Sequence, residues 1–490
     1  MDLLHFFDNS LVDRRESIGL EIQSGSCTLT TLTFGELEIR SNQWAHFFHE
    51  QGFIQGDRLG VYLPSGLDFL LAYLACIKLG VIFVPINFLY KEREIARILE
   101  DAEPRAILTG KPVSGTVPAW DPAIVATKTS QMPCHRLPLK VDENAPAALI
   151  YTSGTTGTPK GAILTRHNFT ANATTLLSFW QIDSADRFLL SLPLFHVHGL
   201  GNGLHCWLLS GCRLRLWEKF EKDKAETTFL SFRPTLFFGV PTIYVYLLGL
   251  PFEICQEIGR DMRLFISGSA PLSTEVFSEF HKKFGHLILE RYGMTETLMI
   301  TSNPYTGERR PGTVGFTLPG VNVQLLDDSG NAVGDNETGE IYVRGPSVFS
   351  GYWRKAEATA NAFRDGFFAT GDLAMRSGDG YYTICGRKSD LIISSGFNVY
   401  PREVEEFLEQ QEGVAEAAVI GFHDPVRGEV PIAYIVPRGK FNPEGIKAIC
   451  SKNLATFKIP QRFVEITELP RNALGKVQKH LLPRRDPFEY

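Results

Sequence analysis

Residues 151–161 read YTSGTTGTPKG, and they follow the apolar run AALI at residues 147–150, which predicts a buried strand. Hydroxyl side chains alternate with glycines in this stretch, and Lys160 stands near its end. Glycine lets the backbone approach an anion closely, hydroxyl and backbone N–H groups can donate to it, and lysine adds positive charge. The stretch therefore favours a polyphosphate-binding loop at the end of a strand, and a flexible linker between two elements is the alternative.

In detail, Pro159 precedes the lysine and Gly161 follows it, so the stretch differs from the common phosphate-loop motif, in which Gly-Lys is followed by Ser or Thr. It resembles the phosphate loop of the adenylate-forming superfamily, which comprises acyl-CoA synthetases, luciferases and amino-acid adenylation domains. The resemblance implies that the loop binds ATP and that Thr156 has a catalytic role. The nucleotide-binding residues that it implies here are Thr152, Ser153, Gly154, Thr155, Thr156, Gly157 and Lys160.

Size and composition limit the other classes of protein. With 490 residues the chain is too long for one hydrophobic core, and 44% hydrophobic and 21% charged residues are typical of a globular protein. A net charge of −6 gives no basic surface for nucleic acid or anionic lipid. The eight cysteines include no C-x-x-C pair, so we expect neither a zinc site nor a disulfide framework, and a reducing, cytoplasmic location fits.

No targeting or membrane segment is expected from the sequence. The N-terminal residues MDLLHFFDNS lack a positively charged region, so they do not predict a secretory signal. Asp68 and Lys78 interrupt the most apolar stretch, residues 67–90, which therefore predicts a buried helix over 67–79 that ends at Gly80, followed by a strand.

The order of patterns predicts two domains. Strand-like and helix-like runs alternate up to about Gly312, which favours an α/β architecture, and hairpin-like runs follow it. The resemblance implies a large domain of two αβ lobes plus a small β-barrel over residues 1–387, and a small mobile α+β domain over residues 391–490. The hinge between them is expected at Lys388, Ser389 and Asp390.

Three further motifs are expected to meet the nucleotide. Residues 267–271 read SGSAP after a predicted strand, residues 292–296 read YGMTE, and residues 370–372 read TGD at a predicted strand end. A carboxylate suits Mg²⁺, and Glu296 is assigned to it as metal ligand and catalytic residue, whereas Asp372 can accept ribose hydroxyls and Arg387 can bind ribose or the α-phosphate. The remaining nucleotide-binding residues implied by the resemblance are Gly268, Ser269, Ala270, Pro271, Tyr292, Gly293, Met294 and Thr295.

The acid, the coenzyme A and the catalytic lysine are assigned by resemblance. His196 and His198 could be metal ligands, but no third ligand stands nearby, and the family places His196 beside the acyl pocket together with Gly239 and Tyr246. Gly396 and Phe397 correspond to the tunnel for the pantetheine of coenzyme A. Lys476, in the segment PRNALGKV at residues 470–477, matches the catalytic lysine.

The predicted function is an ATP-dependent carboxylic acid–CoA ligase that uses Mg²⁺, forms an acyl-adenylate and releases pyrophosphate. RYGMTETLMITSNPY at residues 291–305 resembles malonyl-CoA synthetases most, but these have an arginine where Tyr246 stands, and Arg263 begins a strand. A second carboxylate buried without a cation would be unfavourable. We therefore predict a monocarboxylic fatty or aromatic acid. The alternatives are a malonate or dicarboxylate ligase, an enzyme that loads an acyl carrier protein, and a regulatory protein that binds nucleotide without catalysis.

Overall fold

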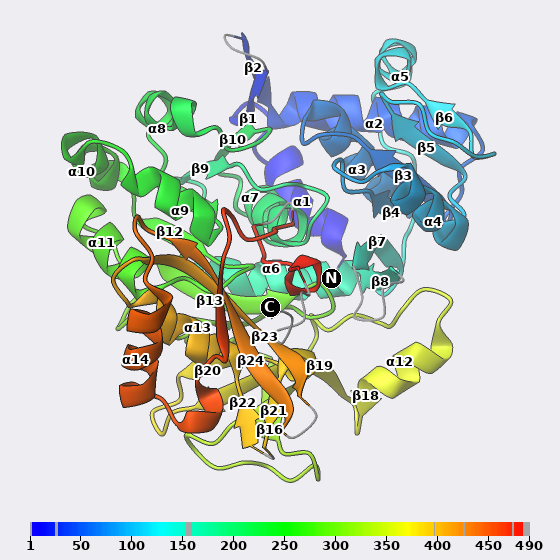
Figure 1. The fold of residues 1–490 in the computed structure, drawn as a ribbon. Coiled ribbons are helices and arrows are strands. Elements are labelled where there is room, and N and C mark those ends of the chain that lie inside the picture. Colours follow the sequence, from blue (N-terminus) through cyan, green and yellow to red (C-terminus); the bar gives the residue numbers. More distant parts are fainter. Residues whose placement is uncertain are drawn as a thin grey trace.

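The computed structural model describes residues 2–24, 28–152, 159–395, 397–424, 427–472 and 475–483. Within these ranges the chain has the predicted α/β fold, with a large N-terminal domain and a small C-terminal domain (Figure 1). The helices are α1 Leu3–Leu11, α2 Phe34–Glu50, α3 Leu67–Leu79, α4 Glu92–Ala102, α5 Pro122–Thr129, α6 Arg166–Trp180, α7 His205–Ser210, α8 Ala225–Phe232, α9 Pro241–Leu248, α10 Phe252–Asp261, α11 Thr274–Phe284, α12 Ala356–Ala362, α13 Pro401–Glu409 and α14 Pro443–Asn453.

The first lobe is built on a six-stranded sheet in the order β6-β5-β3-β4-β7-β8, counted over the described residues. Its neighbouring strands are parallel except for the antiparallel pair β7–β8. The predicted helix over residues 67–79 is confirmed as α3, whose side chains are buried from Phe69 onward, and Gly80 ends it with a left-handed φ of 70°. The strands are β3 Arg58–Tyr62, β4 Ile82–Pro85, β5 Ala106–Thr109, β6 Ala119–Trp120, β7 Pro146–Thr152 and β8 Lys160–Thr165.

The second lobe is built on a larger sheet, in which nine described strands follow the order β15-β14-β13-β12-β11-β9-β10-β1-β2. Register pairs Gly239 with Ser267 and Ser267 with Glu290, so the carboxyl ends of β11 and β12 lie beside Glu290 near the start of β13. This edge brings the 267–271 and 292–296 motifs together. The strands are β1 Ile18–Ser24, β2 Thr28–Thr33, β9 Arg187–Leu190, β10 Arg213–Trp217, β11 Leu236–Gly239, β12 Leu264–Ser267, β13 Leu289–Met294, β14 Leu298–Ser302 and β15 Phe316–Thr317.

The predicted hairpin module is a sheet in the order β16-β17-β19-β18, with β20 also paired to β19. Asp372 was expected at a strand end, and this is wrong: it lies inside β19 and pairs in register with Arg387. The strand continues because Gly371 adopts a φ of 71°, which bends the backbone without ending the pairing. The strands are β16 Asn322–Leu326, β17 Gly339–Arg344, β18 Phe363–Arg364, β19 Phe367–Arg376 and β20 Tyr382–Arg387.

The small domain has a sheet in the order β22-β21-β24-β23, with β25 paired to β24. One face packs into a core with α13 and α14 through Val404, Leu408, Ile446 and Cys450. The boundary at residues 388–390 and the mobility of this domain stay predictions. The strands are β21 Ile392–Ser394, β22 Phe397–Val399, β23 Val414–Asp424, β24 Gly428–Pro437 and β25 Arg462–Glu465.

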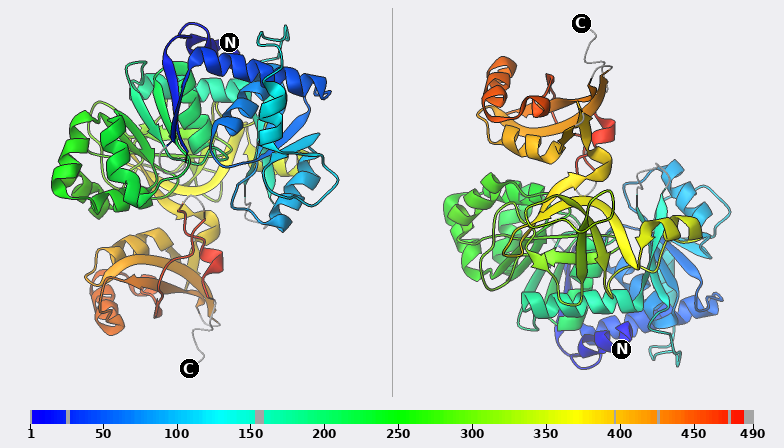
Figure 2. Two further views of the ribbon diagram at one scale, coloured as in Figure 1. Left: turned by 90° about the horizontal axis from the view of Figure 1, so that it is seen from above. Right: turned by 90° about the horizontal axis from the view of Figure 1, so that it is seen from below.

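The small domain contacts the large one through segments that lie far apart in its sequence. Arg438 pairs with Glu275 of α11 at 3.1 Å. Gly475 lies so close to α9 that an added Cβ would stand 3.1 Å from Thr242 Oγ1. In Figure 2 the orange and red C-terminal part projects from the rest of the molecule and is joined to it through the yellow segment. The segment that carries Lys476 therefore touches the large domain although most of the small domain stands clear of it.

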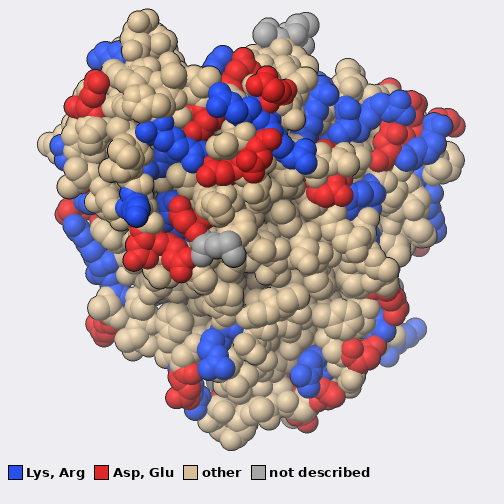
Figure 3. Space-filling view, turned by 180° about the vertical axis from the view of Figure 1, so that it is seen from behind, with Lys and Arg blue, Asp and Glu red and all other residues tan. Residues whose placement is uncertain are grey.

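The surface shows no extended region of a single charge in the view from behind (Figure 3). Lys and Arg side chains alternate there with Asp and Glu side chains. Of the helices in the described ranges, none combines the length and the apolarity that crossing a bilayer requires.

Candidate active site

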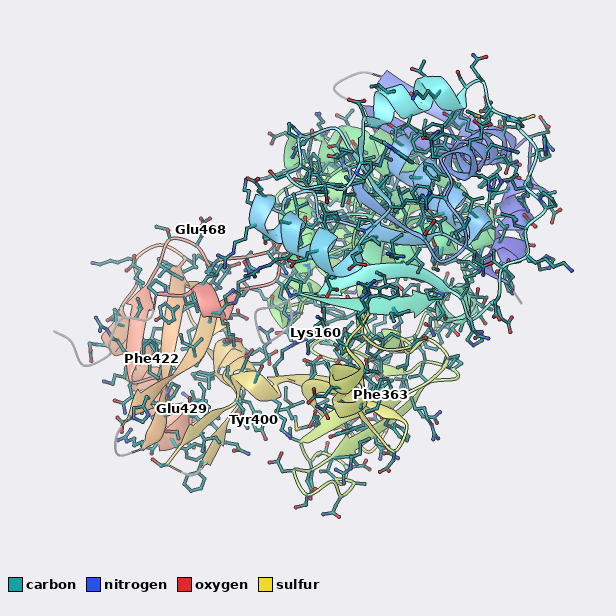
Figure 4. The ribbon with its side chains drawn as sticks, turned by 90° about the vertical axis from the view of Figure 1, so that its right-hand side faces the viewer. Lys160, Phe363, Tyr400, Phe422, Glu429 and Glu468 are labelled. Carbon is teal, nitrogen blue, oxygen red and sulfur yellow. The ribbon has the colours of Figure 1, made fainter. Side chains whose placement is uncertain are left out.

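The β7–β8 hairpin presents the phosphate-loop segment. Thr152, the last residue of β7, pairs with Lys160, the first residue of β8, at the end of the hairpin where the two strands are connected. Figure 4 shows Lys160 where the first lobe, the five-stranded sheet around Phe363 and the small domain meet. The other residues predicted for this loop, Ser153, Gly154, Thr155, Thr156 and Gly157, lie outside the described residues.

Glu296 lies in the tight turn between β13 and β14 and is only 5% exposed. Tyr352 donates from its hydroxyl to Glu296 Oε1 at 3.1 Å. The ring of Tyr352 also faces Lys160, whose Nζ lies 5.1 Å from the ring centroid. Burial raises the pKa of the Glu296 carboxyl, while the hydrogen bond from Tyr352 and the charge of Arg387 act in the opposite direction. One tyrosine thus links the predicted metal ligand to the predicted phosphate-loop lysine.

The β13–β14 hairpin carries the rest of this motif. Tyr292, Gly293 and Met294 continue β13, and Thr295 begins the turn. Position 293 requires glycine because an added Cβ would stand 1.9 Å from the carbonyl oxygen of Leu298. The first three residues of the motif are therefore part of the strand itself.

Asp372 joins the hairpin to the five-stranded sheet. Tyr292 donates from its hydroxyl to Asp372 Oδ2 at 2.6 Å, and Arg387 Nε lies 3.0 Å from Asp372 Oδ1. Asp372 is only 5% exposed. Each carboxylate oxygen has a further lone pair, so ribose hydroxyls could still be accepted. The structure therefore brings together Tyr292, Asp372 and Arg387, although their contacts with a nucleotide stay predictions.

The loop over residues 268–271 is held at both ends. Ser269 has a φ of 70°, which is unusual for a residue with a side chain, and its Oγ lies 3.1 Å from His198 Nδ1. The backbone N–H of Leu272, just after Ala270 and Pro271, donates to Glu290 Oε1 at 3.1 Å. This loop follows β12 at the same sheet edge as the Glu296 hairpin.

Arg291 stands on the other side of Gly268. It is 4% exposed, and its Nε and Nη2 atoms have no hydrogen-bond partner among the described residues. An added Cβ on Gly268 would lie 2.4 Å from Arg291 Cζ, so glycine leaves the room that the guanidinium occupies. Burial lowers the pKa of Arg291 to about 9. A buried cation without a partner is costly, so an anionic group that reached Arg291 would be stabilised there.

His196 and His198 lie next to Arg291. The backbone N–H of His198 donates to His196 Nδ1 at 3.2 Å, so the neutral imidazole of His196 carries its proton on Nε2. Burial, followed by the charges of Arg291 and Lys476, lowers the pKa of His196 to about 4. His198 is 1% exposed, and its Nε2 lacks a partner in the described part of the chain. Both rings therefore stay neutral near neutral pH, and two cations act on His196.

Of the other predicted acyl-pocket residues, Gly239 lies against this group and Tyr246 does not. An added Cβ on Gly239 would stand 3.1 Å from the ring of Tyr244, a residue whose own pKa is affected by the Arg291 charge. Tyr246 is 43% exposed, and its ring stacks on Phe220 with the centroids 6.2 Å apart. The acyl-pocket role of both residues stays a prediction.

Lys476 and Asn472 are joined by hydrogen bonds across a short loop. The backbone N–H of Lys476 donates to Asn472 Oδ1 at 3.0 Å, and the adjacent Gly475 touches Thr242. The side chain is exposed, yet desolvation beside the large domain and the charge of Arg387 lower its pKa. The charge of Lys476 acts on His196 in turn, so the described orientation of the small domain brings this lysine near the histidine predicted beside the acyl pocket.

The predicted tunnel and hinge residues lie apart from these groups. Phe397 is 55% exposed and stacks on Phe457, with the centroids 4.6 Å apart, and Gly396 lies outside the described residues. Lys388, Ser389 and Asp390 form one 3₁₀ turn. Lys388 Nζ is anchored to the large domain, 3.0 Å from Glu340 Oε2.

Tyr352 and Arg291 lie in the site but were not predicted as site residues from the sequence. Tyr352 stands in GYWRK at residues 351–355, far from the Glu296 motif, so only the fold brings the two together. Arg291 directly precedes that motif, and a charge within an otherwise buried strand was a usable signal.

The residues present fit a magnesium ion held jointly with phosphate. Among the described residues, no group of three or more His, Cys, Asp or Glu side chains is placed to hold a metal. Mg²⁺ commonly uses one or two carboxylates together with substrate phosphates and water. Glu296 offers one buried carboxylate beside the Lys160 hairpin, which is enough for such a site.

Comparison with known proteins gives consistent matches along the chain. The AMP-binding enzyme family model matches residues 23–353, and the model of the AMP-binding enzyme C-terminal domain matches residues 403–476. The ATP-bound MatB structure from Rhodopseudomonas palustris superposes with a TM-score of 0.91 at 35% identity, over 98% of each chain.

Three curated relatives are CoA ligases for different acids. Sulfoacetate–CoA ligase of Cupriavidus necator is 35% identical over 91% of both chains. Long-chain-fatty-acid–CoA ligase of Bacillus subtilis is 32% identical over 92% of this chain and 89% of its own. Malonate–CoA ligase of Arabidopsis thaliana is 32% identical over 88% of this chain and 78% of its own.

Proposed function

Because the chain belongs to the AMP-binding enzyme family and is an AMP-forming acid–CoA ligase, we propose that its substrate is a carboxylic acid with a second anionic group. The observation that carries this proposal is Arg291, a buried guanidinium with two nitrogen atoms that lack partners among the described residues. The sequence argument for a monocarboxylic acid depends on the absence of a cation at position 246. Arg291 supplies a cation from strand β13 instead of from helix α9, so the lack of an arginine at position 246 does not exclude a second anion.

The charges around His196 support the same substrate class. Arg291 and Lys476 both lower the pKa of this histidine, so two cations lie near a neutral ring. The reacting carboxylate pairs with Lys476, and the second anion pairs with Arg291 and His198 Nε2. Sulfoacetate and malonate, the acids named for two relatives, each carry a second anion, whereas the fatty acids named for a third do not.

In the first half-reaction the carboxylate attacks the α-phosphate of ATP, and pyrophosphate leaves. Glu296 would hold Mg²⁺ together with the phosphates, and the ion would offset the repulsion between carboxylate and triphosphate. Lys160 and the phosphate loop bind the leaving pyrophosphate, while Asp372 and Arg387 orient the ribose. Lys476 stabilises the charge that develops between acyl and phosphate oxygens.

In the second half-reaction the thiol of coenzyme A attacks the acyl-adenylate, and AMP leaves. Lys476 and the pantetheine compete for the same side of the adenylate, so the small domain turns about residues 388–390 between the steps. Phe397, exposed in the described orientation, then lines the tunnel with Gly396. Loading of an acyl carrier protein is the alternative second step, and thioester assays with both acceptors distinguish them. A cytoplasmic location stays a prediction from the cysteine pattern.

The test is pyrophosphate release by the unmodified enzyme over a panel of acids. Malonate and sulfoacetate are compared with propanoate, butanoate, hexanoate and benzoate at equal ATP and magnesium. We expect kcat/KM to be about 10²-fold higher for a dianionic acid, because a monocarboxylate leaves Arg291 buried and unpaired. Preference for an apolar monocarboxylate would contradict the proposal and favour the fatty or aromatic acid instead.

A further inference from the structure

Tyr352 is a residue that the reaction scheme above does not use, although it touches two groups of the nucleotide site. Its hydroxyl donates to Glu296 Oε1 at 3.1 Å, and its ring faces Lys160 Nζ at 5.1 Å from the centroid. Glu296 comes from the second lobe and Lys160 from the first, so this side chain bridges the lobes on either side of the phosphate loop.

The backbone of Tyr352 is fixed on the outer edge of β8. Ser350 N–H donates to the Ile163 carbonyl at 3.1 Å, and Trp353 N–H donates to the Gly161 carbonyl at 2.8 Å. The segment thus extends the hairpin that carries Lys160 by a further paired stretch. Thr359 of helix α12 adds a hydrogen bond, because its Oγ1 accepts from the backbone N–H of Tyr352 at 2.9 Å. The position of the Tyr352 ring is therefore determined by the same strand that positions Lys160.

Asp101, at the end of α4, ties this arrangement to the strand on the other side of the loop. Its Oδ2 accepts from the hydroxyl of Tyr151 at 2.7 Å, and its Oδ1 lies 3.1 Å from Lys355 Nζ. Trp353 donates from Nε1 to the Asp101 carbonyl at 3.2 Å. Tyr151, just before the phosphate loop, and the Tyr352 segment are thus both held by Asp101.

We propose that Tyr352 is a positioning residue of the nucleotide site, which holds the Glu296 carboxylate and the Lys160 ammonium in one arrangement for a metal-bound polyphosphate. The hydroxyl directs one oxygen of the carboxylate and leaves Oε2 for the metal. The ring limits where the ammonium can stand, because a cation is attracted to its face. This inference rests on the proposed roles of Glu296 and Lys160 in binding magnesium and phosphate.

Two substitutions separate the hydroxyl from the ring. Tyr352→Phe removes the bond to Glu296 and keeps the ring, which also packs edge-on against Phe349 with the centroids 4.8 Å apart. Tyr352→Leu removes both. The readout is the affinity for ATP without any acid present, measured by calorimetry once with excess MgCl₂ and once with EDTA, together with kcat and KM for pyrophosphate release.

In the unmodified protein we expect ATP to bind more tightly in magnesium than in EDTA. In Tyr352→Phe we expect this difference in affinity to be smaller by about tenfold or more, which is the usual effect of losing a hydrogen bond to a charged group. Its affinity in EDTA stays that of the unmodified protein. For Tyr352→Leu the affinity in EDTA also falls, by about threefold, because Lys160 loses the ring. In both variants KM for ATP rises more than kcat falls.

Tyr381→Phe is the matched control. It also removes one hydrogen bond of a buried tyrosine hydroxyl, to the Glu308 carbonyl at 2.7 Å, but at a site away from the nucleotide. It should leave ATP binding unchanged in both buffers. If the unmodified protein binds ATP equally well in magnesium and EDTA, the proposed magnesium site fails and this inference with it. If magnesium strengthens binding and Tyr352→Phe keeps the whole gain, the inference alone is overturned.

Discussion

The proposed nucleotide side and the proposed acyl side of this site differ in how completely their polar groups are paired. On the nucleotide side, Asp372 accepts from Tyr292 and pairs with Arg387, and Glu296 accepts from Tyr352. On the acyl side, Arg291 is similarly buried but has two nitrogen atoms without partners in the described ranges. His198 Nε2, close by, also lacks one.

This difference suggests how each half gains its specificity. The nucleotide is the same in every turnover, so the groups that bind it can be preorganised by hydrogen bonds to one another. The acid defines the individual enzyme, and unpaired buried groups penalise every acid that does not satisfy them. A protein of this kind would therefore discriminate between acids mainly through what they leave unpaired.

The largest effect is expected where the two halves meet, at Lys476. Lys476→Ala should slow acid-dependent pyrophosphate release by about 10²–10³, since one electrostatic stabiliser of the transition state is lost. Thioester formation from a supplied acyl-adenylate and coenzyme A should largely survive, as the lysine acts in the first step. Equal loss of both steps, measured in separate single-turnover assays, would contradict this division.

A substitution of Arg291, on the acyl side, should change the enzyme's preference among acids. Arg291→Leu should lower kcat/KM for malonate or sulfoacetate by about 10², because the second anion then has no buried cation. Activity on butanoate should stay the same or rise, and Arg291→Lys should keep part of the preference for the dianionic acid. A variant that loses activity on all acids alike would assign Arg291 a purely structural role.

A substitution on the nucleotide side, where the polar groups are paired, should weaken the binding of ATP without changing the preference among acids. Asp372→Asn leaves Arg387 without its counter-charge, and we expect KM for ATP to rise about tenfold. The ratio of kcat/KM between malonate and butanoate should equal that of the unmodified enzyme. If this ratio changes as much as in Arg291→Leu, the two halves are not independent.

The smallest effect expected is a shift in pH dependence. The pKa of Lys476 is lowered from the ordinary lysine value of 10.5 by desolvation and then by Arg387, and Lys479 lowers it further. Because the protonated amine is the active form, the adenylation rate should fall as pH rises through a pKa below 10.5. Lys479→Gln should move this alkaline limb to higher pH, while Lys440→Gln, at an exposed site, should not. A limb that moves to lower pH in Lys479→Gln would show that the rate reports another group.

The sequence was informative where a function depends on a local motif. The helix over residues 67–79 followed from an apolar run that Gly80 ends, and Glu296, Asp372, Arg387 and Lys476 were found in short motifs. Contacts between distant segments could not be read in this way. Tyr352 lies 56 residues from Glu296 in sequence and meets it only because its segment pairs with β8.

The substrate was harder to predict for the same reason. The monocarboxylic acid was predicted from Tyr246, where malonyl-CoA synthetases have an arginine, and it stays a prediction, whereas Arg291 stands on β13, beside Gly268 of the loop that follows β12. Strand register at a sheet edge decides which side chains share a pocket, and a single sequence does not give that register. Burial of Arg291 without partners became visible only with the fold.

The most direct measurement is a crystal structure of the enzyme with a non-hydrolysable malonyl-adenylate analogue. The account predicts that the free carboxylate of the analogue accepts hydrogen bonds from Arg291 Nε or Nη2, while the adenylate lies between Asp372 and Lys476. A complex in which this carboxylate faces solvent and Arg291 stays unpaired would contradict it.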